Sequence, residues 1–556
     1  MERRTLLAIA LAMLIAILPS ILFPPRRPPP PGIQPRDTSA ATGPVSPARP
    51  SELTRRPDTV AAVVEHRGDS ATAPTGRDGR RVVVSSPLYR MTFSSQGGRL
   101  MRSELSAYQS FAAGDSGPAQ LVPDQSDFLA YRLIVGRDTV RLADWQFQAS
   151  AESLEVGPEG ATLEWSTTRG GLTVRLVYEF QANEYLFHVR GTAEGLPGGA
   201  LLLVELGPRI HPVEADSVAD IRSYSIVTKA RSTASVGFGS LDSGERQDLA
   251  GPFEWVAVKS KYFVAAVLAL EGDVRFGGAV ATGGARNGRQ ATGVSVSVSL
   301  PVPAGTWQHA VYLGPQEYRR LARIGHDFED VNPYGWIFRP VIRPFANLIV
   351  RVLLWMHEVL RLQYGWVLVL FGLAVRLVLW PLNQIAMRSS TALQAVQPEM
   401  KALQDRYKSE PQKLQQEMMK LYKEHGVNPL GGCLPMLIPM PVLFALFFVF
   451  ANTIEFRGVP FLWLPDLSRA DPLYIIPLVM GISMYGVSKV GQMGVPPNPQ
   501  AKMMLYVMPV MFTVLFLNFS SGLNLYYAVS NIASIPQQWL IAKERLRRMG
   551  GQSKAG

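Results

Sequence analysis

The sequence is poor in the side chains that build covalent, redox and metal sites. It has one cysteine, Cys433, which excludes a disulfide within the chain, and its seven histidines are scattered without metal-ligand spacing. The segment GDSGP at residues 114–118 lacks the second glycine and the His and Asp context of a serine-protease site, and we interpret it as a turn. The segment GFG at residues 237–239 lacks the third glycine of a dinucleotide site. These absences argue against an enzyme, and we predict no cofactor and no metal.

Acidic residues are fewer than basic ones, 44 against 55, which gives a net charge of +11. The basic residues form neither a compact patch nor a recognisable nucleic-acid motif, so we predict no specific nucleic-acid partner. A chain of 556 residues with an apolar fraction of 47% is expected to form at least two units. Membrane topology explains the positive excess better than nucleic-acid binding does.

The first 80 residues contain one apolar run and then a segment without any. In residues 1–23, Arg3 and Arg4 precede a continuous apolar stretch, and no small-x-small cleavage site follows it. We therefore favour an uncleaved transmembrane signal anchor over a removed signal peptide. Residues 24–80 are rich in Pro, Arg, Ser, Thr, Ala and Gly, which predicts a disordered tether.

Alternation of apolar and polar residues begins beyond the tether. It occurs in six segments bounded by Gly, Pro, Asp and Asn: residues 88–93, 161–165, 172–180, 185–189, 255–258 and 294–300. Period-two patterns of this length are typical of half-buried strands. We therefore predict an antiparallel β-sandwich domain at residues 81–325.

Helical spacing and long apolar runs replace this alternation in the second half of the chain. Residues 336–362 combine helical spacing with several arginines, which favours an amphipathic helix along the membrane interface over a buried linker helix. Five strongly apolar segments follow, at residues 364–385, 430–452, 472–490, 503–519 and 522–541. With the N-terminal anchor, they predict a polytopic α-helical membrane protein with six transmembrane helices, five of which form a core at residues 364–541.

Basic residues are distributed unequally between the two sides of these spans. The loop at residues 387–429 and the tail at residues 542–556 are rich in Lys and Arg, whereas the loop at residues 453–471 has two arginines and three acidic residues. Lys and Arg accumulate on the cytoplasmic side of membrane proteins. We therefore predict a multi-pass protein of the bacterial inner membrane with both termini in the cytoplasm and the β domain in the periplasm.

The basic loop at residues 387–429 has an apolar pattern of its own. Leu393, Val396 and Met400 step by three and four, and Leu414, Met418 and Leu421 do likewise. This spacing predicts two short amphipathic helices that pair as a hairpin. We favour a docking or substrate-receiving role for this hairpin over a purely structural spacer.

Arg376 lies within the apolar stretch of residues 366–380 and has no acidic residue within one helical turn. An ionisable side chain at membrane depth costs roughly 2.5 to 3.5 kcal/mol on insertion scales, and such residues usually face a bundle interior or a wet cavity. Arg376 therefore indicates a polar cavity within the predicted core.

Short motifs between the spans occur in a recognisable order. They are NPLGGCLP at residues 428–435, MP at 440–441, DLS at 466–468, DP at 471–472 and SGLNLYY at 521–527. Together with Arg376, these motifs resemble the membrane core of the YidC-type membrane protein insertases (the YidC/Oxa/Alb family). KYF at residues 261–263, and Gly97 and Gly98 ahead of Leu105 and Tyr108, resemble the large periplasmic domain of the form found in bacteria with two membranes. The resemblance covers almost the whole chain outside the tether.

The resemblance implies a membrane protein insertase and folding chaperone whose five core helices enclose a polar groove that contains Arg376. Such a groove is open to the cytoplasm and to lipid and closed on the outer side. The polar groups that could join Arg376 are Asn518, Ser520, Ser521, Asn524, Tyr526, Tyr527, Ser530 and Asn531. Pro435, Pro439 and Pro441 would let a helix flex or form a slide for substrate. The chain departs from the usual family pattern at Gly372 and Pro439, where hydroxyl and glutamine side chains are common.

The implied partners are nascent integral membrane proteins, the Sec translocon, the ribosome and membrane lipids. Two other function classes remain open from the residues alone. A channel or secondary transporter could use Arg376 for an anionic solute, but the sequence shows no internal repeat. An envelope scaffold could act through the β domain, but a single anchor would then suffice.

Overall fold

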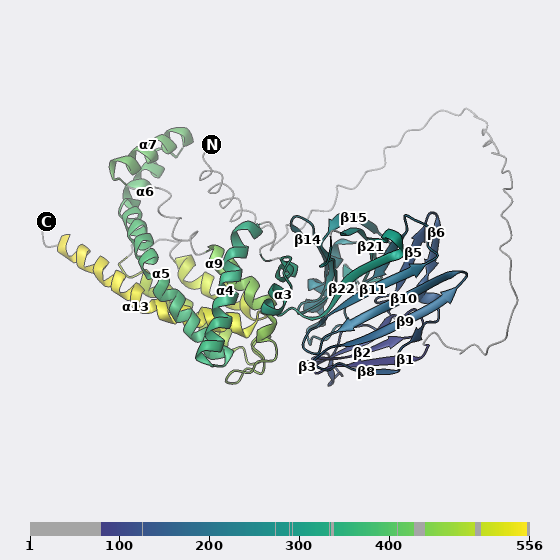
Figure 1. Ribbon diagram of the computed structural model, residues 1–556. Coiled ribbons are helices and arrows are strands. Elements are labelled where there is room, and N and C mark those ends of the chain that lie inside the picture. Colours follow the sequence, from purple (N-terminus) through teal and green to yellow (C-terminus); the bar gives the residue numbers. More distant parts are fainter. Residues whose placement is uncertain are drawn as a thin grey trace, which may run out of the picture. The chain divides into compact units, whose positions relative to one another are not determined.

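The computed structural model describes residues 79–552 except for 125, 273, 288, 289, 292, 333, 335–337, 409, 427–439 and 495–501. The signal anchor predicted at residues 1–23 lies outside the described residues, and so does nearly all of the tether predicted at residues 24–80. The described chain consists of a β domain, which contains all the strands, followed by a helical core (Figure 1).

The widest sheet of the β domain has nine antiparallel strands in the order β14-β13-β16-β17-β22-β11-β10-β9-β7. Its strands are β7 (Gln148–Ala149), β9 (Ala161–Arg169), β10 (Leu172–Phe180), β11 (Leu186–Glu194), β13 (Ser225–Lys229), β14 (Thr233–Gly237), β16 (Trp255–Lys259), β17 (Phe263–Leu268) and β22 (Thr306–Pro315). In β10, Val174, Leu176 and Tyr178 are fully buried while the residues between them are not. This alternation is the two-residue period of a strand that turns one face to a core.

Two further sheets complete the sandwich. The six-stranded sheet contains, in order, β15 (Arg246–Phe253), β18 (Phe276–Gly283), β21 (Val294–Pro301), β12 (Leu201–Glu205), β5 (Tyr131–Val135) and β6 (Asp138–Arg141). The five-stranded sheet contains β4 (Pro118–Gln120), β3 (Leu100–Gln109), β2 (Tyr89–Ser94), β1 (Arg81–Ser85) and β8 (Ser153–Glu155). β19 (Arg286–Asn287) and β20 (Gln290–Ala291) form a separate ribbon. The rings of Phe93 on β2 and Tyr178 on β10 lie 5.5 Å apart, and one apolar core joins the three large sheets. The predicted β-sandwich is confirmed.

Short helices connect or follow the strands of the β domain. They are η1 (Leu142–Asp144), α2 (Ser217–Ser223), η2 (Phe238–Ser240), η3 (Pro303–Gly305), α3 (Tyr318–Ile324) and η4 (Phe328–Val331). Phe328 of η4 packs edge-on against Trp255 and Tyr312, with ring centroids 5.2 and 5.5 Å apart. η4 therefore covers one face of the widest sheet.

The helical core begins with α4 (Arg339–Leu360), at the position of the predicted interfacial helix. Arg339 and Arg343, which the sequence places at an interface, both bind the carboxylate of Asp330, at 3.0 and 2.7 Å. One face of α4 is buried in the apolar cluster of the helical core, whereas Leu348, Trp355 and others on the opposite face are exposed. The helix thus combines an inner packed face with an outer apolar face.

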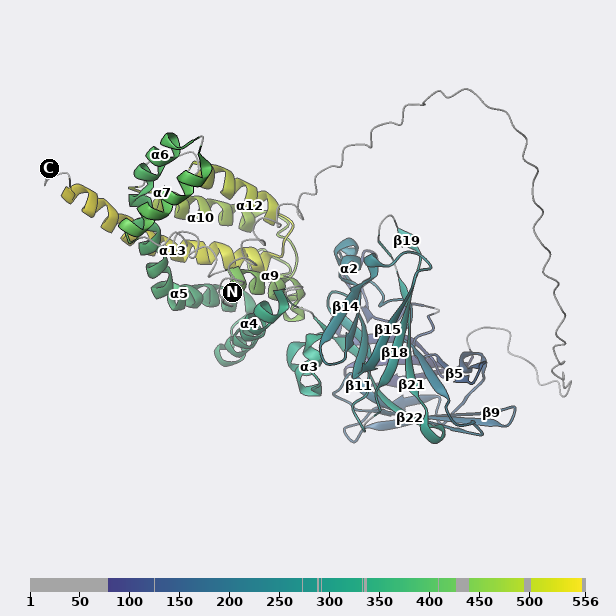
Figure 2. The ribbon, with the colours of Figure 1, turned by 90° about the horizontal axis from the view of Figure 1, so that it is seen from above.

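The remaining helices of the core are α5 (Tyr364–Ala395), α6 (Gln397–Arg406), α7 (Pro411–Glu424), α9 (Met440–Asn452), η7 (Ile454–Phe456), α10 (Ile475–Gly491), the π-helical turn η8 (Met503–Val507), α12 (Met508–Phe516) and α13 (Ser521–Gln552). α13 packs along both α10 and α5, and α4 packs against α9 (Figures 1 and 2). α13 is therefore the central element of the described helical core.

Two boundaries differ from the sequence prediction. α5 continues to Ala395, and the first hairpin helix begins only at Gln397 because Pro398 has no N–H to donate to the carbonyl four residues earlier. α13 continues through the segment predicted as a separate tail from residue 542 and ends at Gln552.

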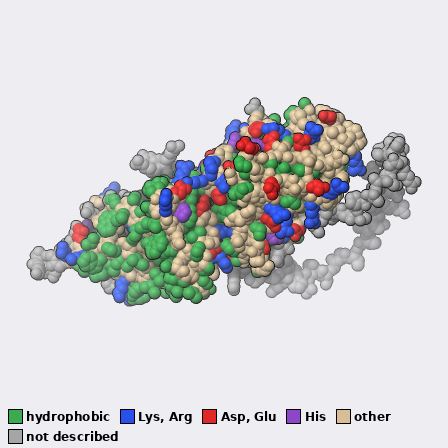
Figure 3. Space-filling model, turned by 60° about the horizontal axis from the view of Figure 1, so that its bottom comes forward, with side chains coloured by type: hydrophobic (Ala, Val, Ile, Leu, Met, Phe, Trp, Pro, Cys, Tyr) green, Lys and Arg blue, Asp and Glu red, His purple; other side chains and the backbone are tan. Residues whose placement is uncertain are grey.

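Only one described helix, over Tyr364–Pro381, is both long and apolar enough to cross a membrane, and three shorter apolar helices cover Pro441–Asn452, Ile475–Gly491 and Met503–Phe516. The predicted count of six transmembrane helices is not confirmed. Large apolar side chains are nevertheless exposed on the helical core, and Leu377, Val378 and Ile482 have 69%, 75% and 70% of their surface accessible. Figure 3 shows hydrophobic side chains gathered over the helical core, in contrast to the mixed charges over the β domain. Exposed apolar surface of this kind is typical of a face that meets lipid or a partner.

Candidate functional site

Arg376 projects from α5 onto α13. Its Nε donates hydrogen bonds to the carbonyl oxygen and to the Oγ of Ser530, both at 2.9 Å. No carboxylate among the described residues forms an ion pair with this guanidinium. Two neutral oxygens orient the cation without cancelling its charge, so the site stays positive.

Gly372 lies one turn before Arg376 and sets the spacing of the two helices. A Cβ atom at this position would lie 3.3 Å from Cγ1 of Val529 and 3.6 Å from the carbonyl oxygen of Tyr526. A small residue lets helix backbones approach closely in a membrane. Where the family commonly has a hydroxyl residue, this chain has Gly372, and α5 approaches α13 closely at this position. The close approach brings Arg376 within reach of the Ser530 backbone.

A polar stripe on α13 continues beyond Ser530. Ser534 and Gln537 are 3% exposed, and Nε2 of Gln537 donates a hydrogen bond to the carbonyl oxygen of Trp380 on α5, at 3.1 Å. Tyr526, Ser530, Ser534 and Gln537 follow one another at steps of four, four and three and so share one helix face. Ser534 and Gln537 were not predicted from the sequence, although the same helical spacing counted from Tyr526 points to them.

Asn524 and Asn531 are seven residues apart and so lie on one face of α13, but they have different partners. Asn524 is fully buried, and its Nδ2 donates to the carbonyl oxygens of Phe516 and Phe519 at 3.0 and 3.5 Å. Its amide therefore braces the turn between α12 and α13. Nδ2 of Asn531 lies 3.4 Å from Oγ of Ser483 on α10. Ser483 was also not predicted from the sequence.

The other predicted site residues are spread around the same helices. Tyr526 is 4% exposed and lies between the rings of Phe371 and Phe450, at 5.8 and 5.9 Å. Tyr527 packs edge-on against Phe516. Asn518 is exposed in the turn between α12 and α13.

Of the three prolines predicted to flex a helix or guide substrate, one is described. Pro441 is the second residue of α9, and it is half-buried. Pro435 and Pro439 lie outside the described residues.

The segment between α9 and α10, residues 453–474, is here named the α9–α10 loop. Its motif residues bind the start of α13: Gly522 N donates to Leu467 O at 2.9 Å, and Oγ of Ser521 donates to Asp466 O at 3.1 Å. Asp471 accepts hydrogen bonds from the backbone N–H groups of Leu473 and Ile476. The DLS, DP and SG motifs therefore lie together at one end of the helical core.

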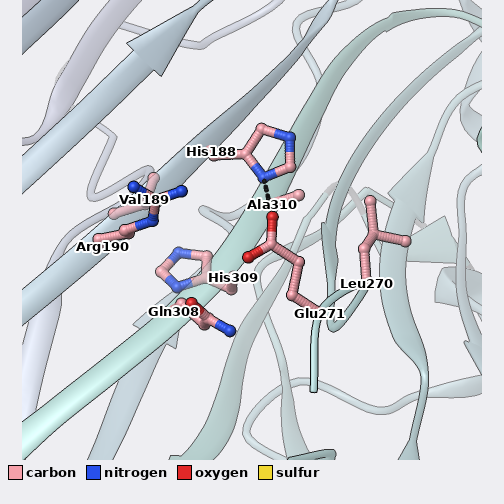
Figure 4. A pocket seen from close by; sticks show the side chains of 8 residues that line it. All are labelled: His188, Val189, Arg190, Leu270, Glu271, Gln308, His309 and Ala310. Atoms are coloured by element: carbon pink, nitrogen blue, oxygen red, sulfur yellow. Dashed lines mark ion pairs between the residues drawn. The ribbon is translucent and has the colours of Figure 1, made fainter.

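The β domain offers a small pocket near His188, whose Nδ1 lies 3.4 Å from Oε1 of Glu271 (Figure 4). Its volume is about 10 Å³, room for about one water molecule. Small-molecule sites usually enclose several hundred Å³. In the part of the chain that the structure describes, no group of three or more His, Cys, Asp or Glu side chains is placed to hold a metal ion.

Comparison with known proteins places both parts of the chain in one family. Residues 81–348 match the model described as the YidC periplasmic domain, and residues 355–548 match the model described as the 60Kd inner membrane protein. The membrane protein insertase YidC of Citrifermentans bemidjiense is 31% identical over 558 residues, which covers 98% of this chain and 99% of that protein. That of Aromatoleum aromaticum is 32% identical over 492 residues and covers 85% and 86%.

Among solved structures, an active YidC insertase with its first transmembrane domain resolved is 18% identical and covers 84% of this chain and 93% of that one, with a TM-score of 0.34. The assignment therefore rests on the sequence matches. The family is not enzymatic, as predicted for this chain, and it is a family of inner membrane proteins with a periplasmic domain. The chain belongs to the YidC family of membrane protein insertases.

Proposed function

We propose that this protein is a membrane protein insertase and folding chaperone that inserts integral membrane proteins and helps them fold or assemble, alone or with the Sec translocon. The observation that carries the proposal is the geometry of Arg376. The cation lies on an apolar helix and is held by the carbonyl and hydroxyl of Ser530. It has no acidic partner among the described residues. Such a charge is available to a substrate.

The guanidinium keeps binding capacity after its contacts with Ser530. Both of these bonds use Nε, and within the described residues the terminal nitrogens form no hydrogen bond. A guanidinium carries five N–H donors in a planar fork that matches a carboxylate. An acidic side chain in the polar tail of an incoming protein would therefore bind here in transit.

Insertion then needs no covalent chemistry. Water in a groove along the α13 polar stripe shortens the apolar distance that a hydrophilic tail must cross, and Arg376 attracts its acidic residues. The apolar part of the substrate leaves sideways, and burial of its side chains in lipid, at about 25 cal/mol per Å², drives release. Tyr526, Tyr527, Asn518, Asn524 and Asn531 are the other proposed groove residues.

The proposed topology has both termini in the cytoplasm and the β domain in the periplasm. The α6–α7 hairpin would then project into the cytoplasm, where its Lys and Arg side chains meet the ribosome, the Sec translocon or the emerging substrate. Pro435, Pro439 and Pro441 would let a helix flex or form a slide for the substrate.

The test uses the purified chain in liposomes with a one-span substrate that has an acidic outer tail. Arg376→Glu replaces attraction by repulsion, and we expect the insertion rate to fall by roughly tenfold or more, because a buried charge left without its partner costs about 3 to 5 kcal/mol and about 1.4 kcal/mol is a tenfold change in rate. Arg547→Glu, which makes the same charge change at an exposed position near the end of α13, is the matched control. Unchanged insertion by Arg376→Glu would refute the electrostatic role, and failure of the unaltered chain to insert would refute the insertase function.

A further inference from the structure

The α9–α10 loop enters the β domain as well as binding the start of α13. Ile454, near its start, is 2% exposed and belongs to the apolar core that the three large sheets share. The rings of Phe450 and Phe456 on either side of it stack at 5.4 Å within the helical cluster. The loop therefore contributes to two hydrophobic cores at once.

Three residues after Ile454, Arg457 is buried in a socket on the β domain. Only 2% of its side chain is exposed, and its Nε lies 2.7 Å from Oε1 of Glu214. Its Nη2 donates to the carbonyl oxygens of Gln109 and Val213, at 2.8 and 3.4 Å. The ion pair and both carbonyl contacts come from the β domain, so the guanidinium serves the junction between the two parts.

Aromatic rings form the walls of the socket. The guanidinium carbon of Arg457 lies 4.3 Å from the ring centroid of Phe111 and 5.4 Å from that of Phe263. Stacking of this kind adds a cation–π attraction, which is strongest when the pair is desolvated. Burial raises the pKa of Glu214 to about 7, and the ion pair with Arg457 opposes that rise.

Two motifs of the β domain that the insertion mechanism leaves unused meet at this socket. Phe263 is the last residue of the KYF motif, and the ring of Tyr108 packs edge-on against it at 5.6 Å. The hydroxyl of Tyr108 donates to Oε1 of Glu317, 2.6 Å away and next to the start of α3. One residue from each of the two motifs, Phe263 and Tyr108, thus lies at or next to the socket of Arg457.

We infer that Arg457 is a positioning residue through which the β domain holds the α9–α10 loop in place. The same loop binds the start of α13 through Leu467 and Asp466. Fixing Arg457 therefore fixes the end of the helix that carries Ser530. The role of this anchoring in insertion rests on the proposed insertase function. The coupling between Arg457, the α9–α10 loop and the start of α13 does not.

The test measures backbone hydrogen exchange in the full chain in lipid nanodiscs at about pH 8, where Glu214 is ionised. Arg457→Met should speed exchange in residues 459–470 by about tenfold or more, with no change in β10, because it removes the ion pair and both carbonyl contacts. Arg457→Lys keeps the positive charge but lacks the Nη2 group that binds the two carbonyl oxygens. It should increase the exchange rate by an intermediate amount. Arg469→Met, an exposed arginine of the same loop, is the matched control and should change nothing.

A second variant separates coupling from general damage. As a single substitution, Glu214→Gln should speed exchange in the loop. Added to Arg457→Met it should change little, because the ion-pair partner of Glu214 is already gone. Equal effects in both backgrounds, unchanged loop exchange in Arg457→Met, or equal acceleration in β10 would each overturn the inference. Insertion into liposomes is scored separately. If the unaltered chain fails to insert, the proposed function is lost while the exchange result still decides the coupling.

Discussion

A buried histidine in the β domain gives the sharpest stability prediction. His309 lies in the middle of β22 and is 3% exposed, and its ring centroid is 6.0 Å from that of Tyr131. Across the ladder it pairs with Val189, which is fully buried, so both side chains point into the sandwich. Neither ring nitrogen has a hydrogen-bond partner among the described residues. Protonation would place an unpaired charge in an apolar core.

Burial, with a smaller contribution from His188, lowers the pKa of His309 from its ordinary value of 6.5 to about 3. The unfolded chain binds this proton below pH 6.5, whereas the folded chain binds it only near pH 3. The contribution of His309 to stability is therefore complete above pH 6.5 and is lost as the pH falls. Linkage gives a loss of about 2 kcal/mol between about pH 8 and about pH 5.

The assay compares urea unfolding of the full chain and of His309→Leu in detergent, followed by circular dichroism of the sheets. The acid loss of unfolding free energy should be smaller by about 2 kcal/mol in His309→Leu. The comparison must be between variants, because burial also raises the pKa of Glu214 and Glu455 to about 7, which acts with the opposite sign. Val311→Ala, on the same strand, should lower stability equally at both pH values. An identical acid loss in His309→Leu and the unaltered chain would refute the reasoning.

Two further substitutions test the packing of the helical core. Asn524→Ala removes the amide that bonds to the carbonyls of Phe516 and Phe519. We expect thermal unfolding to show that the free energy of unfolding falls by about 1 to 3 kcal/mol. An unchanged melting temperature would contradict the bracing role of Asn524. Gly365→Ala places a Cβ 2.0 Å from the ring of Phe461 and should destabilise the chain, whereas Gly486→Ala meets only ordinary contact at 3.8 Å and should be neutral or stabilising. Equal melting temperatures for the two alanine variants would show that the ring moves aside freely.

Strands with one exposed face could be predicted from their alternation, whereas strands buried on both faces were found only in part: residues 255–258 were predicted and form β16, which is buried at every position, but β17 was missed. Residues 172–180 were predicted as a strand from alternation and form β10. β17, with the sequence FVAAVL, is buried at every position and therefore shows no alternation. A short continuous apolar run does not distinguish a buried strand from a buried helix segment.

In the candidate site too, some residues could be predicted from the sequence and others could not. The charge of Arg376 stands out because its surroundings in the sequence are apolar. Its partner Ser530 is 154 residues away, and sequence periodicity could only place it among several polar residues of the last helix. Gln537 was missed because two adjacent glutamines, Gln537 and Gln538, near a basic tail resemble solvent-facing residues. Its bond to the carbonyl of Trp380 depends on how α5 and α13 pack.

The position of Ile454 in the β domain core has a consequence for the order of assembly. Domains generally fold from the N-terminus during synthesis. The sheets are complete at Pro315, but one side chain of their core is made only after α9 has been synthesised. The β domain therefore acquires its last core residue from a segment that follows a predicted membrane span. In the proposed topology, its final folding step therefore waits for the membrane insertion of α9.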